Sequence, residues 1–196
     1  SDLLPSSFCK HYLSHCIRAM PMTHDALRNL GFLVELLPQA ASLPAALLQR
    51  YPNLPADYVA FISRLRCCHT RSDTTWLLTP ADYQTHAEAA FAWNEFEQLS
   101  LEAACKPEET QAILAFWQRH CPIMLCVAPH YAYFAIDLHP HHHGNIVFAC
   151  EPEFETTTVI AADFAAFINA GLAGTWPPEI WAFLPTCLVD NNDKYI

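Results

Sequence analysis

The sequence predicts an α+β domain with a mainly antiparallel sheet of about four to six strands, flanked by helices. Segments with helical spacing fill the first half of the chain, whereas short apolar or alternating runs follow from Pro122 onward. Short turns separate these runs, so consecutive strands are expected to pair in antiparallel fashion. Because helices and strands are segregated along the chain, the pattern favours α+β over a doubly wound α/β fold.

The N-terminal part is predicted to be mostly helical. Weak helical patterns cover residues 7–19 and 24–36, and the start signal at residues 42–44, Ser-Leu-Pro, predicts a further helix. The clearest pattern is LPADYVAFISRLR at residues 54–66, where apolar side chains recur at helical spacing and Pro55 stands in the first turn. We therefore expect an N-terminal helical segment ahead of the sheet.

Two more helices are predicted before the strands begin. Thr79 can cap a helix whose first turn contains Asp82, because a hydroxyl and a carboxylate both stabilise a helix N-terminus. Residues 109–120 place Ile113, Phe116 and Trp117 on one side of a helix.

The strands are predicted from a change of period after Pro122. PIMLCVA at residues 122–128 is a short apolar run, and YAYFAIDL at residues 131–138 alternates between apolar and other positions. The histidine-rich segment that follows contains Gly144 and reads as a hairpin loop leading to a third strand at residues 145–150. A fourth strand is expected at residues 156–160.

The chain is predicted to form a single domain over residues 1–196. After the strands, residues 163–174 have helical spacing and end at glycines, as helices commonly do. We divide the domain into a core at residues 53–172, a helical N-terminal extension at 1–52 and a C-terminal tail with a short helix at 173–196. A chain of 196 residues can bury a core of this kind without disulfides or metals.

Composition indicates a folded, soluble and cytoplasmic protein. Apolar residues make up 53% of the chain and charged residues 15%, which excludes a typical disordered chain. The longest apolar stretch is interrupted by Glu35, Pro38 and Pro44, so no membrane-spanning helix is predicted. Nine cysteines are an odd number and two of them are adjacent, which favours reduced thiols over a disulfide framework.

Charge is distributed unevenly along the chain. The net charge is −10, which argues against direct binding of nucleic acid, because phosphate recognition requires clustered Lys and Arg. Residues 1–72 carry seven Lys or Arg and four acidic residues, whereas residues 73–196 carry three and sixteen. A basic partner would therefore be attracted to the C-terminal two thirds of the chain.

Four segments in a fixed order resemble the SUKH superfamily, in its Smi/Knr cell-wall-regulator branch. They are the helix start at Leu54 to Tyr58, the strand ending in Asp137, the hairpin from Gly144 to Val147 and the helix from Phe164 to Leu172. The resemblance covers residues 53–172. It implies a helix-flanked antiparallel sheet and a non-enzymatic, protein-binding role, in bacteria typically that of an immunity protein that neutralises a cognate toxin.

Two other functions remain open beside the immunity role. The chain could be a regulatory scaffold that docks endogenous proteins, as the fungal relatives of this superfamily do. It could instead be a metal-dependent hydrolase that uses the histidine-rich loop, because His139, His141, His142 and His143 are potential ligands for zinc, nickel or copper. We favour a solvated loop, and we predict no catalytic residues, no metal and no cofactor.

Six residues are predicted to contact the protein partner. If EPEFE stays extended, Glu151, Glu153 and Glu155 lie on one side of a strand, where they could bind Arg or Lys of a basic toxin domain. The partner would contact the following aromatic and acidic side chains on the neighbouring strand face, opposite Phe134 and Ile136: Tyr131, Tyr133 and Asp137.

Overall fold

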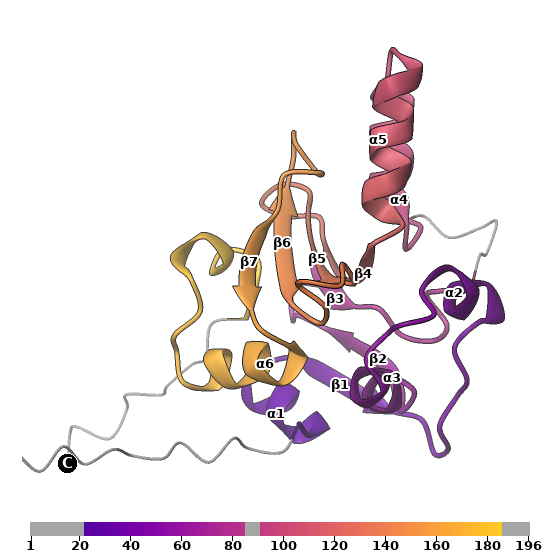
Figure 1. Cartoon of the computed structure of the whole chain (residues 1–196). Helices are drawn as coiled ribbons and strands as arrows, with labels where there is room; N and C mark the ends of the chain where they lie inside the picture. Colours follow the sequence, from indigo (N-terminus) through magenta and orange to yellow (C-terminus); the bar gives the residue numbers. More distant parts are fainter. Residues whose placement is uncertain (1–21, 85–90, 186–196) are drawn as a thin grey trace, which may run out of the picture.

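A computed structural model of the protein describes residues 22–84 and 91–185 and contains one seven-stranded sheet (Figure 1). All neighbouring strands are antiparallel, and their order in space is their order in the sequence. This confirms the α+β class and the antiparallel sheet. The strands are β1 (Leu33–Leu36), β2 (Leu65–His69), β3 (Thr75–Leu77), β4 (His120–Cys126), β5 (Ala132–Asp137), β6 (Ile146–Cys150) and β7 (Thr158–Ala161).

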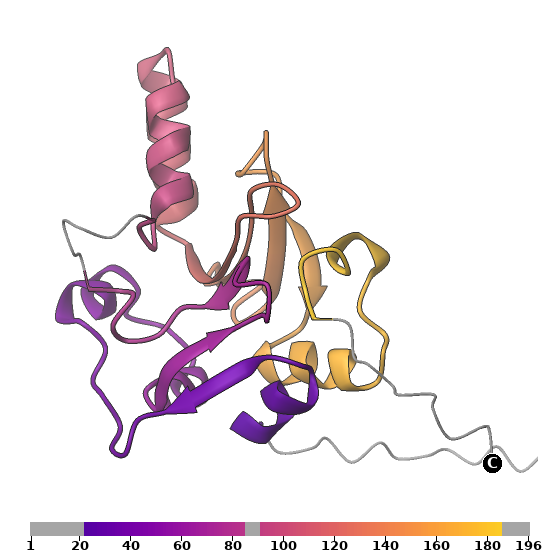
Figure 2. The ribbon, with the colours of Figure 1, turned by 180° about the vertical axis from the view of Figure 1, so that it is seen from behind.

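Six α-helices and one 3₁₀ turn surround the sheet within the described residues. None of these helices is long and apolar enough to cross a membrane. Figures 1 and 2 both show the hairpin formed by α4 and α5 projecting from the body, away from α1 and α6. The elements are α1 (His24–Asn29), α2 (Ala45–Arg50), α3 (Ala56–Ile62), α4 (Glu95–Ala103), α5 (Pro107–Trp117), α6 (Phe164–Leu172) and η1 (Pro178–Ile180).

The central strands are covered on both faces. All six residues of β5 are buried, and successive side chains point to opposite faces of the sheet. Tyr133 contacts the rings of Phe96 on α4 and Trp117 on α5. On the other face, Phe134 packs against Phe167 of α6. The core is therefore continuous through the sheet, with the α4–α5 hairpin on one side and α6 on the other.

The sheet has more strands than predicted because the N-terminal part contains three of them. The expected helix at residues 24–36 ends at Asn29, and Gly31 follows it with a φ of 99°. This left-handed conformation commonly ends helices, and it leads the chain into β1. The expected helix at 54–66 likewise ends at Ile62, because Leu65 already pairs with Leu36 across β1 and β2.

The helix expected to start at Thr79 is absent from the described residues that follow it directly. Thr79 and Asp82 do interact, since the Thr79 backbone N–H and hydroxyl both donate to the Asp82 carboxylate at 2.7 and 2.8 Å. Residues 80–84, however, form turns and not the first turns of an α-helix. The helix expected at residues 7–19 lies outside the described residues.

Candidate functional site

In the α4–α5 hairpin, the helix α5 exposes a run of apolar side chains. Residues 112–117 of α5 are all apolar, Ala-Ile-Leu-Ala-Phe-Trp, yet only Trp117 of the eleven residues in this helix is buried. Leu114 has 42% of its surface exposed. Apolar side chains that stay uncovered on a projecting element are typical of a surface that binds another molecule.

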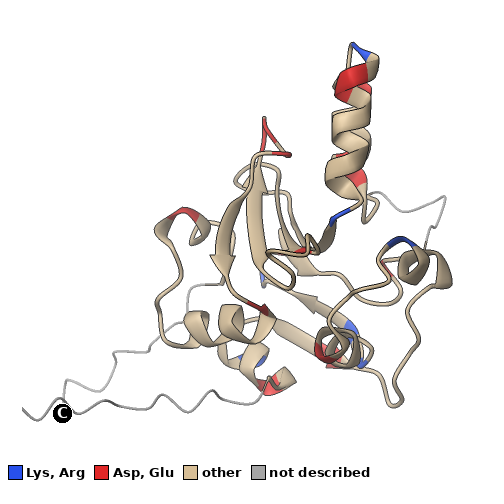
Figure 3. Ribbon diagram, in the orientation of Figure 1, with Lys and Arg blue, Asp and Glu red and all other residues tan. Residues whose placement is uncertain are grey.

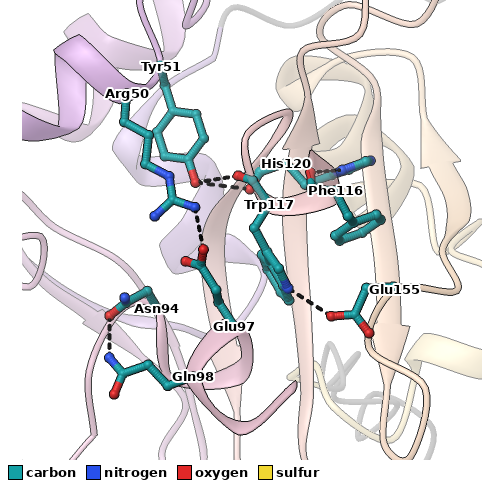
Figure 4. Close-up of polar contacts among 9 residues, drawn as sticks. All are labelled: Arg50, Tyr51, Asn94, Glu97, Gln98, Phe116, Trp117, His120 and Glu155. Atoms are coloured by element: carbon teal, nitrogen blue, oxygen red, sulfur yellow. Dashed lines mark hydrogen bonds and ion pairs between the residues drawn. The ribbon is translucent and has the colours of Figure 1, made fainter. Parts of the chain in front are cut away.

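The base of the hairpin is fixed by a polar network (Figure 4). Arg50, at the end of α2, donates to Glu97 of α4 at 2.7 Å. The Tyr51 hydroxyl donates to the Trp117 carbonyl at 2.9 Å, and the Trp117 indole N–H donates to Glu155 at 2.8 Å. These bonds join two separate segments, residues 50–51 and the β6–β7 turn, to α4 and α5, so the position of the hairpin is set where it meets the body.

Arg50 and Glu97 form an ion pair that is largely removed from water. The side chain of Glu97 is 6% exposed and that of Arg50 is 21% exposed. Burial lowers the pKa of Arg50, but the hydrogen bond to Glu97 and the electrostatic effects of Tyr51, Glu97 and Cys121 together more than offset this, so the pKa is raised and the guanidinium stays charged. The guanidinium also lies over the rings of Tyr51 and Trp93, at 5.3 and 5.6 Å from their centroids.

A cleft of about 580 Å³ lies between this hairpin and the turn that joins β6 to β7, residues 151–157. We call it the hairpin cleft. Its walls are mainly apolar, and their largest side chains come from α4, α5 and the turn: Leu99, Ile113, Phe116, Pro152 and Phe154. A concave apolar surface of this size can take the side chains of a partner segment.

Two carboxylates are the charged groups among the residues that line the hairpin cleft, Glu109 and Glu155. Glu109, in the first turn of α5, accepts a hydrogen bond from the Cys105 backbone N–H at 2.9 Å. Glu155, in the β6–β7 turn, accepts a hydrogen bond from the indole N–H of Trp117 at the end of α5. Figure 3 shows acidic residues beside one basic residue at the tip of the hairpin and acidic residues at the β6–β7 turn, so acidic side chains outnumber basic ones around the cleft. The basic residue is Lys106, which lies 3.8 Å from Glu109.

The predicted row of three glutamates on a strand is wrong. Residues 151–155 form turns, in keeping with Pro152, which has no N–H to donate to a neighbouring strand. Glu151 accepts from the Tyr131 backbone N–H at 3.1 Å, and Glu153 accepts from the Thr156 hydroxyl at 3.3 Å. Only Glu155 of the three lines the hairpin cleft.

The other predicted contact residues lie on the expected strand face, but that face is covered. Tyr133 is completely buried and donates its hydroxyl to the Phe154 carbonyl, so its side chain cannot contact a partner in this structure. Asp137 is also buried, with 7% exposure, and accepts from the His139 backbone N–H. Tyr131 is 38% exposed and remains open to contact.

The histidine-rich loop does not assemble a metal site in the described part of the chain. No three His, Cys, Asp or Glu side chains converge there on a point that could hold a metal ion. His143 is directed to the Asn53 carbonyl at 2.7 Å, whereas His139 and His142 line a smaller cavity of about 390 Å³ that also borders Ala112 and Phe116 of α5. The hydrolase alternative therefore gains no support from this loop.

His120, at the start of β4, is the titratable group whose surroundings predict a pH effect. It stacks on Phe116 with ring centroids 3.9 Å apart and is bonded through Nδ1 to the Phe116 carbonyl. Burial lowers its pKa, while that hydrogen bond and Asp137 act in the opposite direction and Arg119 and His139 add to the lowering. The unfolded chain therefore binds a proton at a higher pH than the folded one.

We expect the free energy of unfolding to fall as the pH drops below the ordinary pKa of histidine, about 6.5. His120→Asn keeps an amide donor for the Phe116 carbonyl but cannot take up a proton. Urea unfolding at about pH 7.5 and about pH 5.5 should show a larger loss of stability for the wild type than for the variant. Equal losses would mean that His120 does not contribute to the pH dependence.

No family model matches this chain, and no curated protein or solved structure matches it either. The resemblance to the SUKH superfamily therefore depends on the four motifs and on their order along the chain.

Sequence reasoning identified Glu155 but not the hairpin cleft or Glu109. The helical pattern at 109–120 gave a signal, because it placed Ile113 and Phe116 together on one side. The pattern does not indicate that α5 projects from the body (Figure 1) and leaves these two side chains half-buried.

Proposed function

We propose that this chain is a non-enzymatic, protein-binding module of the SUKH immunity type that neutralises a cognate bacterial toxin in the cytoplasm. The observation that supports it best is the hairpin cleft, an uncovered apolar surface with carboxylates at its rims. An apolar centre within a charged rim is the usual composition of a protein interface. That the partner is a toxin is inferred from the sequence resemblance. The cleft is the surface on which we propose that a basic partner binds.

Charge supports a basic partner. Apart from Glu97, which pairs with Arg50, the helices α4 and α5 and the β6–β7 turn carry seven glutamates. The loop between the helices carries one lysine, Lys106, which lies 3.8 Å from Glu109. The seven are Glu95, Glu102, Glu108, Glu109, Glu151, Glu153 and Glu155. Such a surplus speeds association with a positively charged surface and disfavours acidic partners. The main contribution of these charges is therefore to the association rate and to specificity.

The immunity role is tested by co-expressing the full chain with the product of an adjacent gene that carries a toxin domain. We expect a complex that co-elutes in size-exclusion chromatography and restores growth of cells that express the toxin. A toxin-domain neighbour that neither binds nor is neutralised would contradict the immunity role.

Two exposed positions of α5 provide a matched test of where the partner binds. Ala112 lines the hairpin cleft, whereas Leu114 is exposed on the same helix and does not line it. Arginine has a high helix propensity, so Ala112→Arg and Leu114→Arg should both keep α5 intact. We expect Ala112→Arg to weaken toxin binding by about tenfold or more and Leu114→Arg to change it little. Equal effects would place the interface elsewhere.

A further inference from the structure

The two carboxylates of the hairpin cleft lie near opposite ends of it. Glu109 belongs to the first turn of α5, and Glu155 is bonded to Trp117, the last residue of that helix. Eight residues of helix separate these two points, which corresponds to about 12 Å along the axis. The two carboxylates of the cleft are therefore associated with positions of α5 that lie roughly two helical turns apart, and Glu109 also lies 3.8 Å from the exposed ammonium of Lys106.

The surface between the two carboxylates is apolar. Ala112, Ile113 and Phe116 come from the intervening turns of α5, and Phe154 faces them from the β6–β7 turn. A segment that binds here must offer cations at its ends and apolar side chains between them. Long basic side chains suit such a site, since their aliphatic stems can lie on apolar walls while the charged ends reach a carboxylate.

The walls of the cleft also restrict which secondary structure the bound segment can have. They are built from helix side chains and from a turn, with no strand edge to which an extended peptide could add. A helix can pack beside α4 and α5 at the usual distance of about 8–10 Å between axes. On such a helix, residues at positions i, i+3, i+4 and i+7 lie on one face.

We propose that the hairpin cleft binds an amphipathic helix of the partner that carries two basic residues seven positions apart, with apolar residues at the third and fourth positions between them. The basic residues pair with Glu109 and Glu155, and the apolar residues pack on Ile113, Phe116 and Phe154. This inference rests on the proposed protein-binding function and specifies what the partner presents.

Two designed peptides test the spacing directly. Both are fluorescein-labelled alanine-based helices of identical composition, with two arginines and two leucines on one face. In the first the arginines are seven positions apart with the leucines between them; in the second the arginines are three positions apart. Fluorescence anisotropy with the full chain should show at least fivefold tighter binding of the first peptide, and weaker binding as salt is added. Equal affinities would overturn the proposal.

Charge-removing variants test the two carboxylates. We expect Glu109→Gln and Glu155→Gln each to weaken binding of the first peptide by about threefold to fivefold. The matched controls are Glu108→Gln and Glu153→Gln, which remove neighbouring exposed glutamates that do not line the cleft. Equal losses in the controls would show non-specific attraction to an acidic surface and would also overturn the proposal.

Failure of this inference and failure of the proposed function give different results. If a toxin bound the Glu109→Gln and Glu155→Gln variants as tightly as it binds the wild type, the helix proposal would be contradicted and the immunity role would not be affected. Spacing-dependent peptide binding without any toxin partner would remove the immunity role and leave the cleft as a helix-binding site.

Discussion

Replacing Arg50 with alanine is expected to lower the free energy of unfolding by about 3 kcal/mol, because Glu97 is then left buried without its partner. The loss should exceed that of a surface ion pair, which contributes about 1 kcal/mol or less. The variant also loses the guanidinium contacts with Tyr51 and Trp93. Urea unfolding at neutral pH, followed by circular dichroism, measures the difference.

A double variant separates the cost of the unpaired charge from the value of the pair. Arg50→Met with Glu97→Leu replaces both ions by apolar side chains of similar length, and such replacements are often close to neutral. We expect this variant to lie within about 1 kcal/mol of the wild type. If Arg50→Ala lost less than about 1 kcal/mol, the pair would be screened by solvent and would not hold α4 against α2.

The central part of the fold is predictable because its signals are local. The helix α3 begins near Pro55 because proline and an acidic residue are favoured in the first turn of a helix. The sequence of β5 alternates because successive side chains of a strand point to opposite faces of the sheet. Strands β1 to β3 are three to five residues long and partly exposed. Their apolar runs are too short to distinguish strand from helix, so residues 24–36 resembled one helix.

The candidate site is less predictable because its residues meet only through tertiary contacts. Arg50 and Glu97 are 47 positions apart in the sequence, and Trp117 and Glu155 are 38 apart. The acidic character of the C-terminal two thirds could be read from composition alone. Residues 151–155 form turns, although their sequence pattern predicts a strand. These turns determine that Glu155, and not Glu151 or Glu153, lines the cleft.

The base of the hairpin and the hairpin cleft share residues, so stability and binding are coupled. Glu155 accepts the Trp117 indole N–H and also lines the cleft, while Phe116, next to Trp117, forms part of its wall. A change that loosens the base therefore moves one wall of the cleft. Variants designed to test binding should leave Trp117 and Arg50 unchanged.

Trp117→Ala is expected to have the largest effect of any substitution in the hairpin, a loss of about 4 kcal/mol in the free energy of unfolding. The side chain has no exposed surface and packs on Phe116 and Tyr133, with ring centroids 5.2 and 4.9 Å away. Its removal leaves a cavity at the point where α5 meets the sheet. Denaturant unfolding measures the loss, and binding of the peptide with arginines seven positions apart should weaken in parallel.

Trp117→Phe shows whether packing or the hydrogen bond to Glu155 holds the hairpin. Phenylalanine keeps most of the ring volume but has no N–H donor, and Glu155 is only half-buried, so water can replace the lost partner. We expect a loss of about 1 kcal/mol for this variant. A loss as large as that of Trp117→Ala would mean that the hydrogen bond, rather than the packing of the ring on Tyr133, fixes α5 to the sheet.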